Sequence, residues 1–128
     1  MFIQVGEIEY ELSTKLGIAQ KIEKKFKMPL AQVFGRIGDA EIPELTGVLA
    51  LAAGKADDLS FTSALLDNWD YIELQTAVQE LLAKLMFSGT PEQVEAKIDK
   101  FPASAEGKNA IRELLGLPKL PITSTANS

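Results

Sequence analysis

The sequence predicts a mainly α fold: a compact multi-helix domain with a short N-terminal β-hairpin. Three observations predict it. Apolar residues recur at spacings of three and four along most of the chain, and strict alternation is confined to the first twelve residues. Gly and Pro stand at the ends of these periodic segments. The length of 128 residues suits one domain. We assign residues 1–116 to a single helical domain and residues 117–128 to a flexible C-terminal tail.

Residues 2–12 alternate between apolar and polar side chains on either side of Gly6. Glycine at the first central position of a two-residue loop suits a type II′ turn, so this segment predicts a β-hairpin. Ile8, Tyr10 and Leu12 are expected to face the helices. Two strands alone are marginally stable. The hairpin is therefore expected to lie on the helical body or to pair with another chain.

A first helix is expected over residues 14–27, with Ser13 as its N-cap. Its predicted buried residues are Leu16, Ala19, Ile22 and Phe26. Its second half is crowded with lysines, namely Lys21, Lys24, Lys25 and Lys27. One interpretation is a solvated face whose cations suit the C-terminal dipole of the helix. The other is a docking patch for an acidic partner.

Two further helices each begin at a proline. The first is short and starts at Pro29, and its inward residues are expected to be Leu30, Val33, Phe34 and Ile37. The second starts at Pro43, ends near Gly54 and is small and apolar nearly all round. Such a helix is buried on more than one side. Either neighbours in the same domain enclose it, or one side meets a partner chain, because large apolar patches seldom stay open to water.

The next two helices include the longest one in the chain. Ser60 is expected to cap a short helix whose inward residues are Phe61, Leu65 and Trp69. The longest helix runs from Asp70 to Phe87 and starts with a capping-box-like pair, Asp70 and Glu73. Its apolar stripe comprises Tyr71, Leu74, Val78, Leu81, Leu82 and Leu85.

The last two helices have the clearest local signals. Thr90 is a predicted N-cap and Pro91 the first helical position of a helix that ends near Lys100. Its inward residues are Val94, Ile98 and Phe101. Ser104 is expected to cap the final helix, which Gly116 ends. The inward residues of that helix are Ile111, Leu114 and Leu115.

The composition argues against catalysis. The sequence has no cysteine and no histidine, which removes thiolate ligands, disulfides and the commonest general base. Asp67 and Asp70 lack the spacing of a calcium loop, and the serines have no histidine to activate them. We therefore expect no catalytic residues, no cofactor, no metal and no enzyme activity.

The charge and hydropathy patterns bear on partners and location. The net charge of −5 counts against nucleic-acid binding. The sequence has no run of eighteen apolar residues and its N-terminus lacks the pattern of a signal peptide, so we expect no membrane span and no secretion. A cytoplasmic protein is the expectation.

A family resemblance lies in the order of the elements and in the segments 16–26, 81–85, 87–94 and 108–117. In these features the chain resembles the tail assembly chaperones of long-tailed bacteriophages, particularly non-contractile-tailed phages. The likeness covers roughly residues 1–117. It implies a non-catalytic helper of virion assembly in the host cytoplasm. Such proteins bind the aggregation-prone tape measure protein, keep it soluble and help recruit tail tube protein around it.

A chaperone of this kind needs apolar grooves for amphipathic helices of its client. The candidate residues for contact with the client or with sister subunits are Leu117, Leu120 and Ile122 in the tail, and Val48 and Leu51 in the small-residue helix. One alternative is a different small helical interaction module, such as another phage assembly factor or an adaptor. A second is an enzyme that uses carboxylates or lysine.

Overall fold

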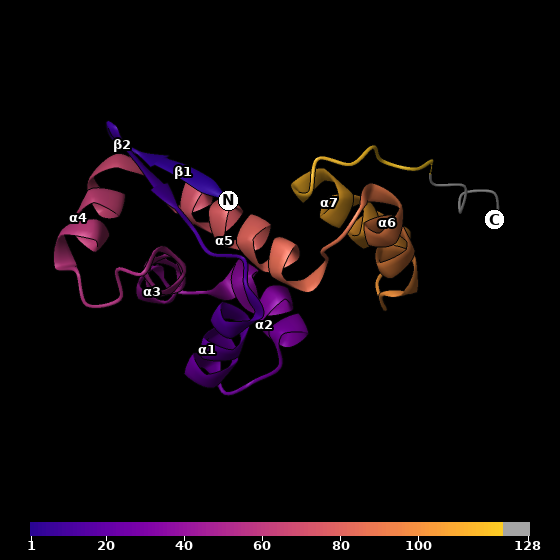
Figure 1. Cartoon of the computed structure of the whole chain (residues 1–128), viewed down its shortest axis with the longest axis horizontal. Coiled ribbons are helices and arrows are strands. Elements are labelled where there is room, and N and C mark those ends of the chain that lie inside the picture. Colours follow the sequence, from indigo (N-terminus) through magenta and orange to yellow (C-terminus); the bar gives the residue numbers. More distant parts are fainter. Residues whose placement is uncertain (122–128) are drawn as a thin grey trace. The chain divides into compact units, whose positions relative to one another are not determined.

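The structure, a computed structural model, describes residues 1–121 and confirms the mainly α fold with an N-terminal hairpin (Figure 1). Over those residues the chain forms two antiparallel strands, seven α-helices and one short 3₁₀ turn. In chain order they are β1 (Phe2–Val5), β2 (Ile8–Glu11), α1 (Leu16–Phe26), α2 (Leu30–Arg36), η1 (Ile37–Asp39), α3 (Ile42–Ala53), α4 (Leu59–Asn68), α5 (Tyr71–Met86), α6 (Pro91–Lys100) and α7 (Ala105–Leu114).

Internal contacts divide the chain into two compact units. The first is Met1–Met86 and the second begins at Phe87. This boundary lies inside the span 1–116 that the sequence analysis assigned to one helical domain. Of the expected tail, residues 117–121 form no helix or strand, and residues 122–128 lie outside the described residues.

The hairpin turns at the predicted position. Val5 pairs with Ile8, which leaves a two-residue loop that starts at Gly6. Gly6 has φ +62°, as the first central position of a type II′ turn requires. Leu12 is buried as expected, but Ile8 is 56% exposed. The expectation for Ile8 was wrong. Its ladder partner Val5 is buried, so neighbouring residues cover β1 at this end of the hairpin and leave Ile8 of β2 exposed.

The hairpin lies on helices of its own unit. The ring of half-buried Tyr10 meets Phe61 of α4 edge-on, with 4.8 Å between ring centroids. The indole N–H of Trp69 donates to the Gln4 carbonyl at 3.1 Å. Just after β2, the Ser13 N–H donates to the Ala52 carbonyl at the end of α3, at 2.8 Å. This ring contact and these two hydrogen bonds hold the hairpin against the helices.

The interior of the first unit is built around α3 and α5. Helix α3 contacts α1, α4 and α5, which favours the interpretation that neighbours of the same domain enclose it. Its residues Leu45, Val48 and Leu49 are fully buried. The predicted stripe of α5 is also buried, apart from Tyr71, which is 38% exposed. Tyr71 is the first residue of α5, where its hydroxyl donates to the Ala40 carbonyl at 2.7 Å.

Helix starts in the first unit agree with the sequence at α5 and differ at α1. The Glu73 N–H donates to the Asp70 carboxylate at 2.8 Å, and the Asp70 N–H donates to the Glu73 carboxylate at 2.9 Å. This is the predicted capping box. Helix α1 starts at Leu16 rather than at residue 14, and its N-cap is Lys15 rather than Ser13. Because Leu16 opens the helix, it is 77% exposed and not part of the buried stripe.

The N-cap of α4 also differs from the expectation. Asp58, not Ser60, occupies this position, and its carboxylate accepts the Ser60 N–H at 2.9 Å. The hydroxyl of Ser60 donates to the same carboxylate oxygen. Hydrogen bonds from this hydroxyl and this N–H lower the pKa of Asp58 below its ordinary value. The Asp58 carboxylate therefore accepts both the N–H and the hydroxyl of Ser60.

The second unit pairs α6 with α7. Thr90 and Gln93 form a capping box at the start of α6, and the predicted bounds of this helix are confirmed. Ser104 caps α7 by accepting the Gly107 N–H at 3.0 Å. The buried apolar residues of this unit are Phe87, Val94, Ile98 and Ile111.

Candidate functional site

A groove of about 480 Å³ lies along α1 and α3 in the first unit. Its lysines come from one face of α1 and its floor comes from small and apolar residues of α3. We call it the basic groove and define it by Lys21, Lys24, Lys25, Gly47, Ala50 and Leu51.

The helical repeat explains this arrangement. Lys21, Lys24 and Lys25 are spaced by three and four residues, so they share one face of α1. Ala19 and Ile22 bury another face of the same helix. This division of faces places three exposed cations beside α3.

At Gly47 the floor of the basic groove is bare backbone, because glycine has no side chain. A Cβ at this position would lie 3.0 Å from Lys25 Cε and 3.1 Å from its Nζ. The end of the Lys25 side chain therefore lies directly over the backbone of α3. A larger residue at position 47 would displace this ammonium group and fill the floor.

The cations of the basic groove have no carboxylate partner within the described chain. None of the four ion pairs found in residues 1–121 involves Lys21, Lys24 or Lys25. Lys21 also lines an adjoining depression that contains Asp57 and Asp58. The positive charge is thus concentrated toward Lys24 and Lys25, in a chain whose net charge is −5.

The contact residues predicted from sequence lie in different places. Leu51 is half-buried and lines the basic groove, whereas Val48 is fully buried in the core and offers no surface. Leu117 is half-buried and Leu120 is 48% exposed, and both belong to the second unit. Ile122 lies outside the described residues. The structure therefore joins Leu51 to the lysines, a combination that the sequence analysis treated as two separate possibilities.

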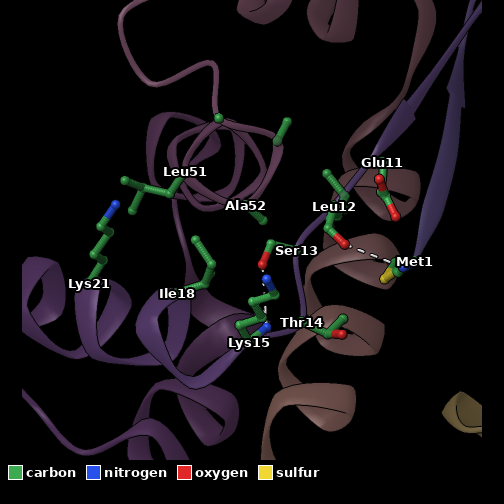
Figure 2. A pocket seen from close by; sticks show the side chains of 12 residues that line it. Met1, Glu11, Leu12, Ser13, Thr14, Lys15, Ile18, Lys21, Leu51 and Ala52 are labelled. Atoms are coloured by element: carbon green, nitrogen blue, oxygen red, sulfur yellow. Dashed lines mark hydrogen bonds between the residues drawn. The ribbon is translucent and has the colours of Figure 1, made fainter.

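A second depression, of about 500 Å³, adjoins the segment between β2 and α1 (Figure 2). Ser13 and Lys15 both line it. The Ser13 hydroxyl accepts the backbone N–H of Lys15 at 3.3 Å, and the N-terminal amine donates to the Leu12 carbonyl at 3.3 Å. Both bonds stabilise the chain leading into α1. The hydrogen bond of the Ser13 hydroxyl is therefore a local contact within this turn.

A third surface combines β1 with the N-terminal half of α5. Phe2 is 62% exposed and Ile72 is 63% exposed, and both line a depression of about 360 Å³ together with Trp69. Glu73 and Glu80 lie at the same depression. The sequence analysis did not identify this patch. The signal that could have revealed it is the pair of adjacent apolar residues Phe2 and Ile3. Neighbouring residues of a strand point to opposite faces, so one of the two must lie on the outer face of the hairpin.

The second unit holds a polar network that sequence reasoning missed. Asn109 is 8% exposed, and its amide bonds both backbone groups of Leu120, accepting from N at 2.9 Å and donating to O at 2.8 Å. Arg112 is 4% exposed, and it donates to the Asn109 side-chain oxygen at 3.0 Å and to Glu95 at 2.8 Å. Asn109 and Arg112 are three residues apart and therefore share a face of α7.

Within residues 1–121, no three acidic side chains gather as ligands of a metal ion would. No helix in that part of the chain has the length and apolar character needed to cross a bilayer. Searches of protein-family models, of curated proteins and of solved structures find no match to this chain.

Proposed function

We propose that this chain is a non-catalytic tail assembly chaperone that binds the tape measure protein and promotes tail tube assembly in a bacteriophage or prophage. The basic groove is the observation that carries the proposal. It offers an apolar floor formed by half-buried Leu51, with Ala50 almost fully buried beneath it, and cations of α1 beside this floor. The resemblance of residues 1–117 to the tail assembly chaperones supplies the identity of the client.

The groove suits a helical client on physical grounds. An amphipathic helix binds by laying its apolar face into an apolar groove. Small residues such as Gly47 and Ala50 let the backbone of such a helix approach closely, and charges along one side of the groove fix its orientation. A long, aggregation-prone protein is kept soluble when its apolar faces are covered in this way.

The test is co-expression with the tape measure protein of a long-tailed bacteriophage. The chain is expected to move the tape measure protein from the insoluble to the soluble fraction and to co-purify with it. Leu51→Glu places a charge on the floor of the basic groove and should reduce this rescue. Leu59→Glu is the matched control, because Leu59 is 82% exposed and lies outside the groove. Circular dichroism of both variants checks that they fold.

The alternative function is another small helical protein–protein interaction module, such as a different assembly factor or an adaptor. The apolar patch at Phe2, Trp69 and Ile72 favours it, because an adaptor needs a second binding surface. Co-expression separates the two functions. An adaptor would leave the tape measure protein insoluble, and that outcome would overturn our proposal.

A further inference from the structure

We infer that the basic groove binds an acidic amphipathic helix of a partner protein. The apolar face of that helix would lie on α3, and its carboxylates would face Lys21, Lys24 and Lys25. The inference rests on the proposal that the chain acts by binding protein. It adds the chemistry of the bound segment, whichever protein carries that segment.

The floor of the groove defines the apolar half of the ligand. Gly47, Ala50 and Leu51 are spaced by three and four residues and form one stripe of α3. Leu51 is half-buried, so part of its side chain is available for contact. A helix with leucines at the same spacings can place them along this stripe.

The lysines define the charged half. All three are exposed and have no ion-pair partner in residues 1–121, so a carboxylate ligand displaces no internal partner. Lys21, Lys24 and Lys25 lie within little more than one turn of α1, so they present a compact cluster of charge at one side of the groove. Glutamates on one edge of a bound helix can match such a cluster.

A protein segment fits these features better than a nucleic acid or a membrane. A nucleic-acid site would favour a basic chain, whereas this chain carries −5. Anionic lipid binds basic amphipathic helices whose apolar face enters the bilayer. Here the apolar side of α1 is buried at Ala19 and Ile22 and is not available to lipid.

The experiment uses the full chain and three synthetic helical peptides labelled for fluorescence anisotropy. The first carries leucines on one face and glutamates beside them. The second replaces every glutamate with lysine. The third has the composition of the first in an order that forms no apolar face. Only the first is expected to bind, and its affinity should fall as salt is raised, because salt screens exposed charges.

Charge reversal tests the location. The double variant Lys24→Glu and Lys25→Glu is expected to weaken binding of the acidic peptide by about tenfold, which corresponds to roughly 1.4 kcal/mol of binding free energy. The same variant should bind the basic peptide better than the unaltered chain does. The matched control is Lys100→Glu with Lys119→Glu, which changes the net charge equally and lies in the second unit. It should bind the acidic peptide as the unaltered chain does.

The outcomes separate this inference from the proposed function. Equal binding of the acidic and basic peptides, or equal weakening by the control variant, would overturn the inference. Binding of an anionic vesicle or of a short single-stranded DNA in place of the acidic peptide would also overturn it. Rescue of the tape measure protein with none of these peptide effects would refute the inference and leave the proposed function supported through another surface.

Discussion

The two compact units differ in what fills their interiors. The first is filled by a continuous set of apolar side chains from the hairpin and helices α1 to α5, including Leu45, Leu49 and Leu81. The second buries few apolar side chains and adds the polar network of Asn109 and Arg112. A pair of short helices has little apolar surface to bury. Hydrogen bonds between buried side chains therefore contribute a larger share of the stability of the second unit.

This difference predicts two kinds of sensitivity. An apolar interior responds to lost volume, since neighbouring side chains relax only partly into a cavity. A polar network responds to the loss of any member, because the remaining groups are left without partners.

Leu49→Ala should cause the largest loss. Leu49 is fully buried in the first unit, so its truncation is expected to cost about 3 kcal/mol of the free energy of unfolding. Urea denaturation followed by circular dichroism measures this. Leu59→Ala is the control, because Leu59 is 82% exposed and its truncation should cost less than about 0.5 kcal/mol. Similar costs for both variants would mean that α3 is not the interior of the first unit.

Asn109→Ala probes the second unit. It removes both bonds to Leu120 and one of the two acceptors of buried Arg112, which keeps only Glu95, so we expect a cost of about 2 kcal/mol. Hydrogen exchange at the Leu120 amide should become faster, while exchange in α3 stays the same. Asn68→Ala removes a bond from an exposed asparagine to Ala64 and serves as the control. Unchanged exchange at Leu120 would show that the network does not order this segment.

Asp58→Ala removes the N-cap of α4 and should lower the free energy of unfolding, because the Ser60 N–H loses its side-chain acceptor. The pKa of Asp58 is lowered in the folded chain, so its stabilisation is present above the ordinary value of 3.8 and is lost as pH falls below it. The difference in stability between the two proteins should therefore shrink toward low pH. A difference that grows on acidification would contradict the assignment of Asp58 as the cap.

Gly47→Ala is expected to stabilise the first unit by about 0.5 kcal/mol, because alanine has the higher helix propensity. The new methyl meets only the end of the flexible Lys25 side chain, which can move aside. A rise in the denaturation midpoint tests this, and Gly35→Ala in α2 is a comparison with no neighbour within 4 Å. Destabilisation at position 47 alone would mean that the Lys25 contact is rigid.

Much of the fold could be predicted from the sequence where local signals are strong. Thr90, Pro91 and Gln93 specify the start of α6 through backbone and capping chemistry alone, and its bounds were predicted correctly. The errors fall at the ends of elements. Ile8, Leu16 and Tyr71 are more exposed than expected, because burial at an end depends on which neighbour covers it and periodicity carries no information about that. The N-caps assigned to Ser13 and Ser60 were wrong because the helices start at other residues, with Lys15 and Asp58 as their N-caps.

The candidate site was predictable only in parts. The lysines of α1 and the small residues of α3 were each identified from their pattern. Their meeting in one groove depends on how two helices pack, which spacing within each helix does not determine. Asn109 and Arg112 were missed because polar side chains on the inner face of α7 do not contribute to the apolar periodicity that predicts burial.

Hydrogen exchange of the full chain with the acidic amphipathic peptide tests the central claim most directly. The account predicts slower exchange on peptide addition in two segments, the C-terminal half of α1 and residues 47–51 of α3. It predicts no change in α6 and α7. Protection confined to the second unit, or protection by the basic peptide in place of the acidic one, would contradict it.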